Sequence, residues 1–150
     1  MIQYKTSINE IVNLFKNNFK SLDGGQHSLK FSLEDYGDDF IKVRMMVQHL
    51  ITLKLKQDGE FVNAIFSFDF KGQDQFGASN IGANKGYARI VEFINENLDS
   101  SCVTESAKDF HKEMIDAIGQ GTKYMQKLVI WGIIIVSLII LASLLPIMLI

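Results

Sequence analysis

Three groups of residues in this chain could do chemistry, and the first is a glycine-rich stretch. Gly77, Gly82 and Gly86 precede a predicted helix, and Lys85 and Arg89 lie beside them. Backbone N–H groups at a helix N-terminus can cradle a phosphate. The spacing matches neither the Walker A motif nor the dinucleotide-binding fingerprint, so a flexible turn-rich connection is the simpler interpretation.

The second candidate is His49, which falls on the apolar side of a predicted strand. A histidine in that position must be hydrogen-bonded, lie at an edge or serve a function. His27 would lie close enough for a two-histidine metal site, but no third ligand is evident. Together with the glycine-rich stretch, His49 gives a candidate ligand pocket. Its residues are His49, Gly82, Lys85, Gly86 and Arg89.

The third group is an acidic cluster formed by Glu34, Asp35, Asp38 and Asp39. Carboxylates can hold a hard cation, but this cluster lacks the alternating ligands and the distal glutamate of a calcium loop. A solvated turn is the simpler interpretation. Serine, Cys102 and the histidines form no recognisable nucleophile motif, so we expect no enzyme activity, no catalytic residue, no metal and no cofactor.

The elements that position these groups follow from hydrophobic periodicity. Ser7 and Glu10 fit a capping box, after which apolar residues recur on one helical face until Gly24. Alternation of period two then predicts a strand around Phe31 and a second, unusually long strand from Ile41 to Leu55, which we expect to be bent or bulged.

A hairpin follows the long strand. Asp58-Gly59 is a type I′ turn signal, and it sets a register in which paired residue numbers sum to 117. Leu55 then pairs with Val62 and His49 with Phe68, so that apolar positions meet on one face. A second helix is predicted from Tyr87 to Leu98 by its apolar spacing.

The predicted fold class is α+β, in the order α-β-β-β-α. A three-stranded antiparallel meander with helices on one face forms a cytosolic domain over residues 1–100, followed by a juxtamembrane helix over 101–127. Double-stranded RNA-binding domains share this order and carry a basic helix start where this chain has residues 82–89. Only Lys85 and Arg89 are basic there, and the net charge of the chain is −2, so nucleic-acid binding is not expected.

Residues 128–150 form an uncharged apolar run of 23 residues. As a helix this run is roughly 34 Å long, enough for a hydrocarbon core of about 30 Å, so we expect one transmembrane anchor. Lys123 and Lys127 precede it, which places the N-terminal domain in the cytosol. Without a secretory signal at the N-terminus, this is the pattern of a tail-anchored protein. Plasma membrane, endoplasmic reticulum and mitochondrial outer membrane all fit.

Two surfaces are candidates for interaction. Alternate positions of the sheet give a basic outward face with apolar spots, which could dock an acidic protein or anionic lipid headgroups. Its residues are Lys42, Arg44, Met46, Leu50, Lys54, Lys56, Phe61 and Ile65. The juxtamembrane helix carries a second apolar stripe, which either self-associates or packs on the chain's own domain. Its residues are Ala107, Phe110, Met114, Ala117, Gly121 and Tyr124.

Together these features predict a membrane protein that is not an enzyme. The leading hypothesis is an adaptor or accessory subunit of a membrane protein assembly, with a protein partner bound through the cytosolic domain. The alternative is a ligand-sensing membrane effector that forms homo-oligomers through its juxtamembrane and transmembrane helices.

Overall fold

The computed structural model describes residues 1–24, 30–46, 49–70 and 78–148, and these form an α+β fold with a long C-terminal helix. The predicted fold class is therefore confirmed. In chain order the elements are β1 (Ile2–Tyr4), α1 (Ile8–Asn18), the 3-10 helix η1 (Phe19–Gly24), β2 (Phe31–Tyr36), β3 (Phe40–Met45), β4 (His49–Asp58), β5 (Phe61–Phe70), α2 (Ala78–Asn97) and α3 (Glu105–Met148).

The sheet has five antiparallel strands in the order β1-β5-β4-β3-β2, so the prediction of a three-stranded meander was wrong. The predicted long strand is a hairpin of two strands, because the chain turns at Met46, whose φ is 57°. Met45 pairs with His49 across that turn. β1 was missed because three residues are too few to establish an alternating pattern.

The β4–β5 hairpin exists, but its predicted register was wrong. Asp58 pairs with Phe61, and Leu55 pairs with Ala64 rather than Val62. The two central turn residues are therefore Gly59 and Glu60. Of these only Gly59 has a positive φ, at 60°, which makes the turn type II′ rather than I′. The slip is two residues, so every side chain keeps its predicted face.

Replacing Gly59 with valine should destabilise this hairpin, because a β-branched residue resists positive φ. We expect the free energy of unfolding to fall by about 1–3 kcal/mol, the usual cost of a strained backbone position. The change is measurable as a lower melting temperature of the full chain in detergent. Gly59→Asn is the control, since asparagine tolerates such turns. An unchanged melting temperature for the valine variant would contradict the turn assignment.

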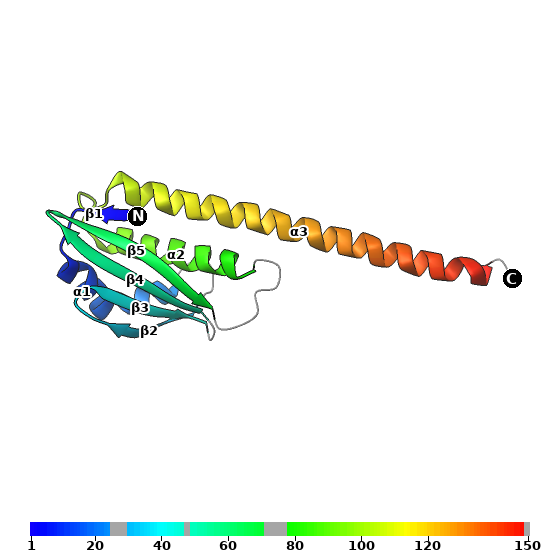
Figure 1. The fold of residues 1–150 in the computed structure, drawn as a ribbon, viewed down its shortest axis with the longest axis horizontal. Coiled ribbons are helices and arrows are strands. Elements are labelled where there is room, and N and C mark those ends of the chain that lie inside the picture. The colour runs from blue at the N-terminus through cyan, green and yellow to red at the C-terminus, as the bar shows by residue number, and fades with distance from the viewer. Residues whose placement is uncertain (25–29, 47–48, 71–77, 149–150) are drawn as a thin grey trace.

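The first helix begins as predicted, with the Ser7 hydroxyl accepting a hydrogen bond of 3.3 Å from the Glu10 N–H. The Glu10 carboxylate accepts from the Thr6 hydroxyl. Phe15 is fully buried, and its ring meets that of Phe93 on α2 edge to face at 5.0 Å. α1 and α2 therefore share one core, and Figure 1 shows both of them on the same side of the sheet.

α2 begins at Ala78, earlier than the predicted start at Tyr87, so Gly82 and Gly86 lie inside a helix rather than in a loop. A Cβ on Gly86 would lie 2.3 Å from Ile51 Cδ1, and one on Gly82 would lie 3.5 Å from His49 Nε2. These glycines therefore let α2 lie close against β4. Their backbone N–H groups belong to the helix and are not the predicted phosphate cradle.

α3 is one continuous helix of 44 residues that joins the predicted juxtamembrane helix to the predicted anchor. Its first turns lie alongside β1 and α2, and the rest extends well beyond the domain (Figure 1). The described part of the helix contains an 18-residue window with a mean hydropathy of 2.1, none of which is buried. One C-terminal helix is therefore long and apolar enough to cross a membrane.

Candidate functional site

The sheet face opposite α1 and α2 carries the predicted partner-binding residues. Backbone pairing places Arg44 beside Leu50 and Lys54 beside Ile65, with Lys56 and Phe61 farther along the hairpin. Met46 lies at the turn that follows β3 and is 56% exposed. We call this surface the open face; its strand residues are Lys42, Arg44, Leu50, Lys54, Lys56, Phe61 and Ile65.

Half of the basic charge on the open face is paired with the acidic cluster. Arg44 Nε lies 2.9 Å from Glu34 Oε1, and Lys42 Nζ lies 3.6 Å from Asp35 Oδ2. The hydrogen bond from the Arg44 guanidinium, followed by one from the Ser32 hydroxyl, holds the pKa of the Glu34 carboxyl below its usual range. Within the described ranges no three His, Cys, Asp or Glu side chains are grouped to hold a metal ion.

The other half of the open face keeps its positive charge. Lys54 and Lys56 are exposed, and no carboxylate of the described residues lies within 4.0 Å of either ammonium group. Ile65 lies directly across the hairpin from Lys54 and is 50% exposed. Lys54, Lys56 and Ile65 form a surface in which two cations, neither paired with a described carboxylate, lie around one apolar side chain; we call it the basic patch.

The predicted ligand-pocket residues are used in packing. His49 is half-buried, with its ring 5.3 Å from that of Phe68 and its Nε2 facing Gly82. Lys85 is half-buried on α2. His27 and Gly77 lie outside the described residues.

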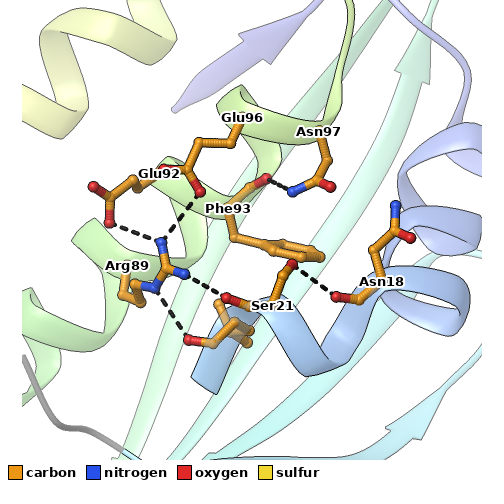
Figure 2. A network of polar contacts seen from close by, with 8 residues as sticks. Asn18, Ser21, Arg89, Glu92, Phe93, Glu96 and Asn97 are labelled. Atoms are coloured by element: carbon orange, nitrogen blue, oxygen red, sulfur yellow. Dashed lines mark hydrogen bonds and ion pairs between the residues drawn. The ribbon is translucent and has the colours of Figure 1, made fainter. Parts of the chain in front are cut away.

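Arg89 is the most extensively bonded of these residues, because it is 5% exposed and binds four groups (Figure 2). Its Nε donates to the Leu22 carbonyl at 3.1 Å and its Nη2 to the Ser21 carbonyl at 2.6 Å. Nη1 donates to Glu92 at 2.9 Å and to Glu96 at 3.4 Å. The guanidinium therefore clamps η1 to α2, which is a structural role rather than the predicted ligand contact.

The predicted self-association stripe of α3 packs mainly on the chain's own domain. Ala107 is fully buried, and the Phe110 ring stacks on that of Phe66 with centroids 5.8 Å apart. A Cβ on Gly121 would lie 2.8 Å from Ile81 Cγ1 on α2. Met114 and Ala117 are half-buried. Of the six stripe residues, Tyr124 stays largely exposed, at 61%.

A cavity of about 330 Å³, which sequence reasoning missed, lies where β5, α2 and α3 meet. Its walls include Phe66, Tyr87, Phe110 and Met114, and Met1 lies at the same site. Burial raises the pKa of the Tyr87 hydroxyl. The cavity adjoins β5 just beyond the point where β1 stops pairing with it, at Ala64. The local signal for β1 in the sequence was the alternation of Ile2 and Tyr4. Because β1 pairs with β5, the same alternation was the signal for this part of the sheet.

Comparison of the chain with protein-family models, with curated proteins and with solved structures returned no match.

Proposed function

We propose that this chain is a single-pass membrane protein whose α+β domain binds a protein partner, as an adaptor or accessory subunit of a membrane assembly. The observation that carries the proposal is the open face, which none of the described helices covers. Antiparallel sheets commonly leave one face to solvent. Two cations that no described carboxylate pairs with, placed around a half-exposed isoleucine, are less usual there. Charged groups around an apolar side chain are typical of the rim and core of an interface.

The membrane part of the proposal rests on α3. Lys123 and Lys127 precede the apolar run and favour a cytosolic domain, and Tyr124 and Trp131 have the positions of interfacial aromatic anchors. Contact between Gly121 and Ile81 ties α2 to the helix seven residues before Leu128. At 1.5 Å per residue, that contact lies about 10 Å before the start of the span. The domain is thereby held near the membrane surface.

The proposed partner carries carboxylates around an apolar side chain, which complements the basic patch. Charge pairs at the rim of an interface mainly accelerate association and make it salt-dependent. Anionic lipid headgroups share the negative charge but lack the apolar centre. Lys42 and Arg44 contribute less than the sequence suggested, because Asp35 and Glu34 already pair with them.

The test is the double variant Lys54→Glu/Lys56→Glu in the full-length protein, purified in mild detergent with its stoichiometric partner. We expect association to slow on the order of tenfold, with a reduced salt dependence. Lys108→Glu/Lys112→Glu makes the same charge change on the exposed side of α3 and should bind as the wild type does.

Equal partner binding by the two double variants would reject the open face as the docking surface. If instead Lys54→Glu/Lys56→Glu weakens binding to vesicles containing anionic lipid and leaves partner binding intact, the face contacts lipid and the adaptor proposal fails.

A further inference from the structure

We infer that the outer edge of β5, from Phe66 to Phe68, accepts an extended segment of the partner as an additional strand in line with β1. This inference rests on the proposed docking function and specifies how the partner is held. It adds main-chain pairing at the edge of the sheet to the side-chain contacts of the open face.

The hydrogen-bond pattern of the sheet determines which groups point to this edge. Asp58 and Phe61 close a two-residue turn, so Phe61 exchanges main-chain hydrogen bonds with β4. In an antiparallel ladder such residues alternate with residues that point the other way. On β5 the odd positions therefore face β4, and the even positions, including Phe66 and Phe68, direct their N–H and C=O groups to the opposite edge.

β1 supports this assignment independently. Ile2 pairs with Ala64 and Tyr4 with Val62, both even positions of β5. Gln3 points away from β5, since its N–H donates to Ser106 Oγ at 3.0 Å and its carbonyl accepts from Thr104 Oγ1 at 2.5 Å. The next even residue after Ala64 is Phe66.

Phe66 and Phe68 have no main-chain partner on this side among the residues described. Their N–H and C=O groups form a ladder site of two positions, about 7 Å apart. Such unpaired edge groups are a template for another strand. An extended polypeptide offers alternating donors and acceptors at this spacing, so the pattern favours a polypeptide segment as the occupant.

The other described edges are either covered or irregular. β1 is covered by the start of α3, because the Lys5 N–H donates to the Cys102 carbonyl at 2.9 Å and Thr104 and Ser106 bind Gln3. β2 has a register shift between Leu33 and Asp35, and its charged side chains pair with β3. Bulges and charges of this kind protect sheet edges from pairing. The stretch of β5 from Phe66 to Phe68, which no described strand pairs with on this side, lacks both.

The cavity lies beside this stretch and gives the incoming strand a place for a side chain. Phe66, Phe110 and Met114 line it, and 330 Å³ is enough space for an apolar residue. Side chains of an added strand alternate between the two faces of the sheet. The inward residues would enter the cavity, and the outward residues would lie beside Ile65 and Ser67, with Lys54 on the next strand. The expected segment therefore alternates apolar and acidic residues.

The first measurement is amide hydrogen exchange of the full-length protein in micelles. We expect Phe66 and Phe68 to exchange on the order of 100-fold faster than Ile65 and Ser67, although all four lie within one strand. Similar protection at all four amides would show that the edge is already covered, and would overturn the inference. Protection of Phe66 and Phe68 that grows with protein concentration would mean pairing between copies, which overturns the assignment to a partner.

The second measurement uses a synthetic probe of alternating valine and glutamate, about eight residues long, which is a typical strand length. It should slow exchange at Phe66 and Phe68 about tenfold or more. The same peptide, N-methylated at the amides that would face β5, should have no effect. Equal effects of the two peptides, or none from either, would reject strand addition.

A matched pair of variants tests the cavity. Met114→Trp fills it and should abolish protection by the peptide, whereas Ile115→Trp, at the exposed neighbouring position on α3, should not. The melting temperature of each variant reports folding. If Lys54→Glu/Lys56→Glu weakens partner binding but the peptide never protects Phe66 and Phe68, docking by the open face stands and strand addition fails. If only Met114→Trp loses partner binding, strand addition stands and docking by the open face fails.

Discussion

Replacing Arg89 with methionine should lower the free energy of unfolding by about 3–5 kcal/mol, the usual cost of breaking a buried charge network from one side. Methionine retains most of the volume of the side chain but none of its donors. The Ser21 and Leu22 carbonyls would lose charge-assisted hydrogen bonds, and Glu92 would lose its cation. The effect is measurable by thermal or urea unfolding of the full chain in detergent.

Two control variants separate the contribution of the Glu96 ion pair from that of the guanidinium hydrogen bonds. Glu96→Gln should cost less than about 1 kcal/mol, because the Glu96 side chain is 56% exposed and its carboxylate lies 3.4 Å from Arg89 Nη1. Arg89→Lys keeps the charge but offers a single ammonium where three nitrogens of the guanidinium now donate, so we expect an intermediate loss. If Arg89→Met unfolds at the wild-type temperature, the clamp between η1 and α2 contributes nothing to stability.

Placing two arginines in the apolar part of α3, as Ile135→Arg/Ile139→Arg, should release the protein from membranes. Each arginine near the centre of a span opposes insertion by about 3 kcal/mol, so the pair costs about 6 kcal/mol. Both isoleucines are more than half exposed in the structure, so the domain itself should stay folded. Alkaline extraction of membranes, followed by detection of the protein in the soluble and pelleted fractions, measures the result.

The control is Ile115→Arg, the same substitution on the same helix outside the apolar run. Ile115 is 41% exposed, so an arginine there is accommodated and membrane association should be unchanged. A double variant that still resists alkaline extraction would contradict the transmembrane role of α3 and, with it, the membrane part of the proposed function.

Features that depend on neighbouring residues could be predicted from the sequence. The Ser7 cap, the apolar side of α1 and the inward and outward faces of β3 to β5 follow from local hydrogen bonding and from hydrophobic periodicity. The apolar run of α3 could be predicted from amino-acid composition alone. For the same reason alternation predicted which strand side chains point away from the helices, since a slip of two residues in register leaves side chains on the same face.

Features that depend on contacts between distant parts of the chain could not be predicted from the sequence. The start of α2 was misplaced because Gly82 and Gly86 resemble loop residues until their packing against His49 and Ile51 is known. Met46 looked like a strand residue, because nothing local signals a positive φ at a methionine. The ion pairs of Lys42 and Arg44 could not be predicted either, because their carboxylate partners lie on a different strand, β2.

Periodicity and composition act over a few residues, and they were enough to specify an α+β domain with one open sheet face and a C-terminal helix apolar enough for a bilayer. Tertiary packing was needed to establish that Arg89 clamps η1, that the stripe from Ala107 to Gly121 packs on the domain, and that β1 pairs with β5 from Val62 to Ala64. Each of these depends on which surfaces meet across long stretches of chain. That choice is made by the burial of the whole core rather than by any local pattern.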